Sequence, residues 1–285
     1  MNEGFRALED GDVSLMESGW LGAVPPEYDA GMNLRAWWAG ALLLASSALC
    51  LGEDAPKLHS GKPIQVLLIT GGCCHNYPFQ SAQLTNAVAK RADVKFTVVN
   101  EGGNGTRGQI ALYDNPEWAK PYDVVVHNEC FADTADIDYI RKITAAHRAG
   151  KPAVVVHCAM HTYRATSFDD WREFLGVTSR YHEHQSRYPV YVMDRKHPAM
   201  AGIPDKWVTA MDELYIIEKM AATARALATS RSEKTGADQP VAWENNYHGT
   251  RVFGTTYGHS DDAFRDPVFL EMLARGIVWA SKPAK

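Results

Sequence analysis

Residues 64–75 read IQVLLITGGCCH, a largely apolar run that ends at a glycine pair, two cysteines and a histidine. An apolar run of this length predicts a strand buried on both faces, as in parallel sheets. Three later segments repeat the strand pattern, at 94–99, 123–127 and 152–157. Segments of helical length, 81–91 and 135–148, lie between them. The alternation predicts an α/β fold with a doubly wound, mostly parallel sheet and helices on both faces.

The second half of the chain is denser in short apolar segments. We expect strands at 188–193, 214–218, 225–229, 241–243 and 250–255, and a closing helix at 267–280. Neither an internal repeat nor a linker divides this region. The sequence therefore predicts a single domain over residues 58–285.

Residues 1–57 are expected to form an extension outside the fold, with a signal peptide at 32–52. Arg35 precedes an apolar run at 36–44, and small residues follow, which is the layout of a secretory signal. A membrane anchor is the alternative, but glycine and serine interrupt the apolar stretch. We therefore expect an exported protein, periplasmic or extracellular, without stable membrane insertion after cleavage.

The charge balance excludes a polyanionic partner. The chain has 29 basic and 34 acidic residues, but residues 1–52 carry seven of the acids and two of the bases. The remainder is neutral, so it has no basic field to attract nucleic acid. The eight tryptophans and 46% hydrophobic content exclude a disordered chain.

Histidine and cysteine gather where the predicted parallel strands end. The histidines are His75, His127, His157, His161 and His259, and the cysteines are Cys73, Cys74, Cys130 and Cys158. Ligands of open α/β sheets bind at the carboxyl ends of the strands. Histidine titrates near neutral pH and serves as an acid, a base or a metal ligand. The pattern predicts a functional cleft at this edge.

The cysteines and glycines at this edge allow two further interpretations. Cys158 follows a strand, as a nucleophile on a strained turn would, but no G-x-C-x-G surrounds it. The adjacent Cys73 and Cys74 are expected to be packed thiols rather than bridged to each other. The pair Gly71-Gly72 is not followed by G-x-G-x-x-G or GK[ST], so no nucleotide cofactor is expected.

Several segments together resemble the trehalose-utilisation (ThuA-like) family. They are ITGGCCHNY at 69–77, HPAMAGIP at 197–204, DELY at 212–215 and the block at 249–280. The resemblance implies a flavodoxin-like fold similar to class I glutamine amidotransferases. It also implies a role in sugar utilisation, often beside oxidoreductases that make 3-keto sugars. The Cys-His-Glu arrangement of amidotransferases is not recognisable here, so glutamine hydrolysis is not expected.

Five positions match family motifs and supply the candidate catalytic and metal-binding groups. We expect His75 and Glu213 to be catalytic, and His157, His184 and His259 to bind one divalent metal ion, Zn or Mn. The neighbouring His182 is the alternative to His184. The expected substrate-binding residues are Tyr77, Asn128, Glu129, His161, Tyr163, Arg164 and Tyr257.

The leading functional hypothesis is an exported enzyme that cleaves a glycosidic bond in an oxidised (3-keto) sugar. A base would remove the proton beside the ketone, an electrophilic metal would stabilise the enolate, and an acid would assist the leaving group. One alternative is a non-catalytic carbohydrate-binding protein. Another is a thiol hydrolase of amidotransferase type that uses Cys158. The expected partner is a small-molecule sugar.

Overall fold

The computed structural model describes residues 55–282. The predicted signal peptide at 32–52 lies outside the described residues, and so does nearly all of the predicted extension at 1–57. Within residues 55–282, no helix combines the length and apolar character needed to cross a membrane. The single-domain boundary at 58–285 stays a prediction.

A nine-stranded sheet forms the centre of the fold, in the order β2-β1-β3-β4-β11-β10-β9-β6-β7. Its first half is parallel and consists of β2 (Ala92–Asn100), β1 (His59–Gly72), β3 (Val124–Cys130), β4 (Ala153–Val156) and β11 (Thr250–Thr255). Its second half is antiparallel and consists of β10 (Asp238–Tyr247), β9 (Ala224–Arg231), β6 (Pro189–Val192) and β7 (Lys206–Val208). A separate antiparallel pair joins β5 (Val177–Ser186) to β8 (Asp212–Met220).

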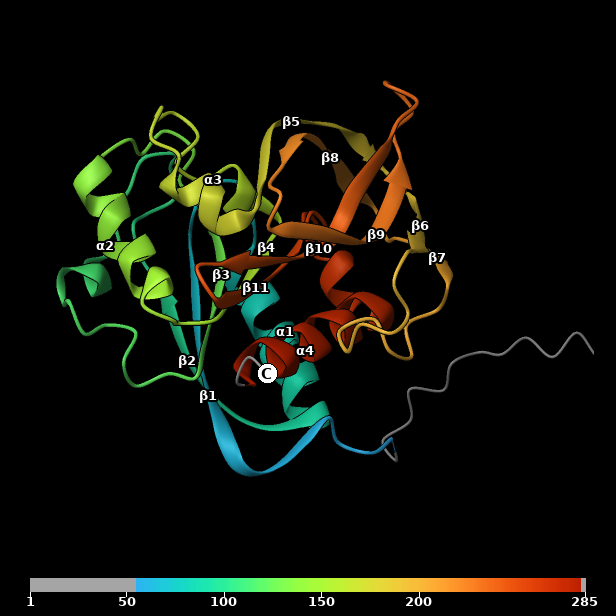
Figure 1. Ribbon diagram of the computed structural model, residues 1–285, viewed down its shortest axis with the longest axis horizontal. Coiled ribbons are helices and arrows are strands. Elements are labelled where there is room, and N and C mark those ends of the chain that lie inside the picture. The colour runs from blue at the N-terminus through green and yellow to red at the C-terminus, as the bar shows by residue number, and fades with distance from the viewer. Residues whose placement is uncertain (1–54, 283–285) are drawn as a thin grey trace, which may run out of the picture. The chain divides into compact units, whose positions relative to one another are not determined.

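Helices cover both faces of the large sheet (Figure 1). On one face α1 (Tyr77–Arg91) and α4 (Pro267–Ser281) pack against Val66 and Leu68 of β1. On the other face α2 (Ile137–Arg148) and the short α3 (Asp170–Leu175) pack on the side of Leu67 and Ile69. Because successive side chains of a strand point to opposite faces, the uninterrupted apolar run of β1 supplies both cores.

The predicted doubly wound, flavodoxin-like α/β fold is confirmed, and its elements lie close to their expected positions. Three 3₁₀ turns complete the described chain: η1 (Ala111–Asp114), η2 (His157–Met160) and η3 (Ala263–Arg265). A side-chain cap and a proline define the start of α4. The side chain of Asp266 accepts from the amide of Val268, with Pro267 at the first helical position of α4.

Candidate functional site

Two glycines bring the first site residues to the end of β1. Gly71 and Gly72 both have positive φ, 142° and 89°. A Cβ atom at Gly71 would lie 2.0 Å from the carbonyl oxygen of Glu101, and one at Gly72 would lie 2.1 Å from that of Cys130. Only glycine fits between the ends of the neighbouring strands, so this pair lets the chain turn and present His75.

His75 is oriented by a chain of two hydrogen bonds. Its Nδ1 lies 3.2 Å from Tyr77 Oη, which donates to the Cys73 carbonyl oxygen at 3.1 Å. Because the Tyr77 hydroxyl donates its hydrogen to that carbonyl, its oxygen accepts a hydrogen bond from Nδ1–H of His75. In this tautomer His75 Nε2 keeps its lone pair. His75 Nε2 is buried and has no hydrogen-bond partner among the described residues. Leaving a buried nitrogen without a hydrogen-bond partner is costly, so we expect His75 Nε2 to contact a ligand or a substrate group.

His157 is fixed in a similar way at the end of β4. Its φ is 48°, an unusual value for a residue other than glycine, so the strained position after this strand is His157 rather than Cys158. His157 Nδ1 donates to the Thr256 carbonyl oxygen at 2.7 Å. This bond sets the tautomer and leaves the Nε2 lone pair directed into the site.

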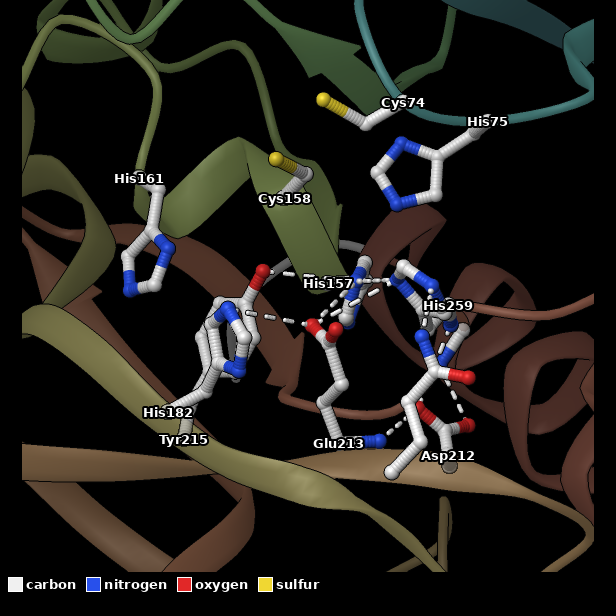
Figure 2. Close-up of polar contacts among 12 residues, drawn as sticks. Cys74, His75, His157, Cys158, His161, His182, Asp212, Glu213, Tyr215 and His259 are labelled. Atoms are coloured by element: carbon white, nitrogen blue, oxygen red, sulfur yellow. Dashed lines mark hydrogen bonds and ion pairs between the residues drawn. The ribbon is translucent and has the colours of Figure 1, made fainter. Parts of the chain in front are cut away.

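His259 completes a cluster of three imidazoles (Figure 2). One ring nitrogen each from His75, His157 and His259 lies within 4.8 Å of the other two. His259 Nδ1 is 3.3 Å from His157 Nε2. The three rings come from separate loops that follow β1, β4 and β11, so the parallel half of the sheet assembles them.

Glu213 of β8 adds a carboxylate to this histidine cluster. Its Oε2 lies 3.4 Å from His259 Nδ1, 3.7 Å from His157 Nε2 and 3.6 Å from His182 Nε2. The adjacent Asp212 holds the loop of His259, because its carboxylate accepts the amides of Gly258 at 2.9 Å and His259 at 3.2 Å. Burial raises the pKa of Asp212 to about 7, against the lowering effect of these hydrogen bonds.

Burial keeps the clustered imidazoles neutral. It lowers the pKa of His75 to about 4, helped by the neighbouring His259. It holds the pKa of His157 well below its usual value. Burial also lowers the pKa of His259, although Glu213 opposes that shift. Each neutral imidazole has one lone pair, and at neutral pH those of His75 Nε2 and His157 Nε2 can bind a metal ion or accept a proton. His259 Nε2 accepts from the side-chain amide of Gln185 at 2.8 Å, so His259 joins a metal site only when that amide turns away.

Stacked imidazole and tyrosine rings border the histidine cluster. The His161 ring stacks on Tyr215 at 4.0 Å between centroids, and Tyr215 Oη lies 3.3 Å from His157 Nε2. His182, whose side chain is 40% exposed, stacks on the same tyrosine and reaches Glu213 from the solvent side. Sequence reasoning missed Asp212 and Tyr215, although both belong to the DELY motif with Glu213.

One residue of the predicted metal-ligand set lies apart from the other two. The structure brings His157 and His259 together with His75, and it places His184 elsewhere. The His184 side chain is 65% exposed and lies 3.7 Å from Glu233. His182, the alternative to His184, contacts Glu213 instead of joining the three imidazoles.

Several predicted sugar-binding groups are buried and already paired. Tyr77 positions His75, as described above. Asn128 Nδ2 donates to Gln80 Oε1 at 3.2 Å. Glu129 Oε1 pairs with His127 Nδ1 at 2.9 Å in a fully buried contact. The other carboxylate oxygen of Glu129, Oε2, is buried without a hydrogen-bond partner among the described residues. The role of these three residues in binding substrate stays a prediction.

The remaining predicted binding residues differ in their surroundings. Tyr163 is completely buried in the core, and the buried Tyr257 hydroxyl bonds to Ser230 at 2.7 Å. His161 borders the site but is buried, and its Nε2 lies 3.0 Å from Ser179 Oγ. Arg164 is exposed and donates to the Arg180 carbonyl oxygen. Large aromatic side chains bury much apolar area, which explains why the tyrosines lie in the core.

The four cysteines within residues 55–282 form two disulfides beside the histidine cluster. Cys73 is bonded to Cys74, so the expectation of two packed thiols was wrong. Cys130 is bonded to Cys158. A thiol hydrolase would need Cys158 as a free thiolate, and the disulfide removes that nucleophile.

Known proteins share this fold and sequence pattern. The ThuA family, described as trehalose utilisation, matches residues 65–280. A ThuA-like protein of Parabacteroides merdae is 25% identical, with a TM-score of 0.60 over 78% of this chain and 91% of that one. A ThuA-like protein of Bacteroides uniformis is 17% identical, with a TM-score of 0.59 over 78% and 93% of the two chains. None of the curated proteins matches the sequence.

The family match spans most of the chain and includes His75, His157, Glu213 and His259. The similar structures have the same type of α/β fold over nearly their whole length. The chain therefore belongs to the ThuA (trehalose utilisation) family.

Proposed function

We propose that this protein is an enzyme of carbohydrate utilisation that cleaves a glycosidic bond in a 3-keto sugar. In this proposal one divalent metal ion, Zn or Mn, assists acid/base chemistry at the cluster of His75, His157 and His259. Membership of the ThuA family supports the sugar context. The chemistry is inferred from the residues of the site.

The convergence of three neutral imidazoles on one point is the observation that carries the proposal. Catalytic zinc commonly has three protein ligands and an open position. Second-shell hydrogen bonds to the far nitrogen of each ligand are usual, and Thr256 and Tyr77 supply them for His157 and His75. The donor set therefore fits Zn or Mn. A bound ion would polarise the ketone oxygen of the substrate.

Glu213 is the proposed base. Its carboxylate lies within 3.4–3.7 Å of two imidazoles of the cluster and is 8% exposed, so it can face a substrate held there. It would take the proton from C2, next to the C3 ketone, and the C–H electron pair would form the enolate. The enolate would then restore the ketone, form the C1=C2 double bond and expel the glycosidic oxygen.

His182 is the proposed acid for the leaving group. Its Nε2 lies 3.6 Å from Glu213 Oε2 on the solvent side of the site. A proton taken by Glu213 can therefore pass to His182 and on to the departing oxygen. The products are an alcohol and an unsaturated keto sugar, and no oxidant or reductant is consumed.

Deuterium exchange at C2 tests this proposal apart from bond cleavage. Purified protein with zinc or manganese is incubated with native and 3-keto disaccharides in D₂O, with and without chelator. We expect exchange and cleavage only for the 3-keto sugar, and only with metal. Glu213→Gln should abolish exchange. Glu218→Gln, on the same strand but exposed beside Arg180, should leave it unchanged.

Three results would oppose the proposal. They are equal exchange in both variants, equal turnover of native and 3-keto sugars, and activity insensitive to chelator. Sugar binding without exchange in the metal-loaded protein would favour a carbohydrate-binding protein instead.

We also propose that the enzyme acts outside the cytoplasm, from the signal-like pattern at 32–52. N-terminal sequencing of secreted material should find a first residue between about Leu51 and Ala55. A mature chain that retains residues 36–44 would contradict export by signal cleavage.

A further inference from the structure

The two disulfides touch each other. Cys73–Cys74 follows β1, and Cys130–Cys158 joins the end of β3 to η2. Cys73 Sγ lies 3.6 Å from Cys130 Sγ, which belongs to the other disulfide. Figure 2 shows Cys74 and Cys158 beside His75. The amide of Cys73 also donates to the Cys130 carbonyl oxygen at 3.2 Å, which fixes the two segments in register.

Solvent reaches the two disulfides unequally. Cys74 is exposed and Cys73 is half-buried. Cys130 and Cys158 are only 3% and 7% exposed. Thiol–disulfide exchange requires direct contact between the attacking thiolate and a sulfur atom. A dithiol in solution can therefore meet the first disulfide, while burial shields the second from direct contact.

We propose that the four cysteines form a relay that passes reducing equivalents from a dithiol in solution to the buried disulfide. The proposal does not depend on the sugar chemistry. It assigns a thiol–disulfide exchange activity to residues that the proposed cleavage does not use.

The relay has three steps. The dithiol reduces Cys73–Cys74 and leaves as its own disulfide. The Cys73 thiolate then attacks Cys130 Sγ, so that a Cys73–Cys130 bond forms and Cys158 leaves as a thiolate. Finally, Cys74 attacks Cys73, which re-forms the first disulfide and releases Cys130. Two electrons and two protons move from the dithiol to Cys130 and Cys158.

This transfer would change the surroundings of the histidine cluster. The sulfur atoms of Cys130 and Cys158 lie within 4.8 Å of each other and of a ring nitrogen of His75. Reduction would therefore place two thiols beside His75. The exposed disulfide would act as the entry point, and it would be regenerated after each transfer.

The rate at which Cys130 and Cys158 are reduced tests the relay. Dithiothreitol is added to the folded protein, samples are alkylated over time, and peptides are quantified by mass spectrometry. In the double variant Cys73→Ser/Cys74→Ser, we expect the buried disulfide to be reduced at least about tenfold more slowly than in the wild type. Equal rates, or free thiols at all four positions in the untreated protein, would overturn the proposal.

A single variant tests the intermediate and does not require the double variant to fold. Cys74→Ser removes the group that resolves the mixed disulfide, so Cys73 should become bonded to Cys130 and Cys158 should become open to alkylation. Peptide mapping should find this new bond. A free Cys73 beside an intact Cys130–Cys158 disulfide would contradict the relay. Circular dichroism of each variant checks that the fold is retained.

Discussion

Lowering the pH should destabilise this protein, and buried His161 should account for about 2 kcal/mol of the loss between roughly pH 7 and pH 5. The His161 ring is 4% exposed and stacks on Tyr215. Burial, followed by the positive charge of Arg164 and the neighbouring His182, lowers its pKa to about 3. The ordinary value is 6.5.

The sign follows from proton binding. Between these two pKa values the unfolded chain binds a proton at His161 and the folded chain does not. The contribution of His161 to the free energy of unfolding is therefore fully present above about pH 6.5. It is lost progressively as the pH falls towards 3. At roughly pH 5 the unfolded histidine is almost fully protonated, which gives the figure of about 2 kcal/mol.

Urea unfolding of the wild type and of His161→Gln at several pH values measures this contribution. Glutamine keeps a polar group facing Ser179 but does not titrate, so the variant should lose about 2 kcal/mol less stability over this pH range. His184→Gln is the matched control, because His184 lies on β5, the strand that also carries Ser179, but its side chain is 65% exposed. An identical pH dependence in the wild type and His161→Gln would show that His161 does not contribute to the loss of stability.

Three further changes probe the site and its supports. His75→Ala should remove most of the zinc that the purified protein binds, whereas His184→Ala should leave the zinc content by elemental analysis unchanged; zinc loss in His184→Ala but not in His75→Ala would restore the ligand set predicted from the sequence. Gly72→Ala should destabilise the protein to urea by at least about 2 kcal/mol, because its Cβ atom would meet a carbonyl oxygen at 2.1 Å. Gly61→Ala should cost less, since Gly61 also has positive φ but nothing lies within 4 Å of its Cβ position, and equal costs would argue against the clash. In competition titrations Asp212→Ala should weaken zinc binding at least about tenfold, because it releases the loop after β11, and Asp212→Asn should retain most of the affinity. Unchanged zinc binding in the alanine variant would show that Asp212 does not support the site.

The parallel half of the fold is readable from the sequence because each strand there is buried on both faces. The run at 64–70 has no alternation of polar and apolar residues, which distinguishes it from a strand at a solvent-facing sheet. The short helix α3 and the strands β5 and β7 were not predicted. Their residues are held by tertiary contacts, such as the donation from Trp171 Nε1 to the Ala159 carbonyl oxygen, rather than by a local periodic pattern.

The site was partly predictable for the same topological reason. His75, His157 and His259 all follow parallel strands, and the carboxyl ends of such strands meet at one edge. His184 was misplaced because β5 is irregular. In a regular strand His182 and His184 would share a face, but the register against β8 shifts between His182 and Gln185. Sequence periodicity does not reveal that shift.

The two disulfides show a different limit of sequence reasoning. Spacing along the chain does not determine which cysteines pair, and Cys130 and Cys158 are 28 residues apart. They meet because β3 and β4 are neighbours in the sheet. The glycine pair before Cys73 then brings the first disulfide against the second.

Anomalous diffraction from crystals of the zinc-loaded protein locates the proposed metal site. We predict one strong peak bonded to His75, His157 and His259, with zinc–nitrogen distances of roughly 2.0–2.1 Å and Glu213 beside the ion. A peak bonded to His184 or to other groups, or no peak among these three histidines in the presence of excess zinc, would contradict it.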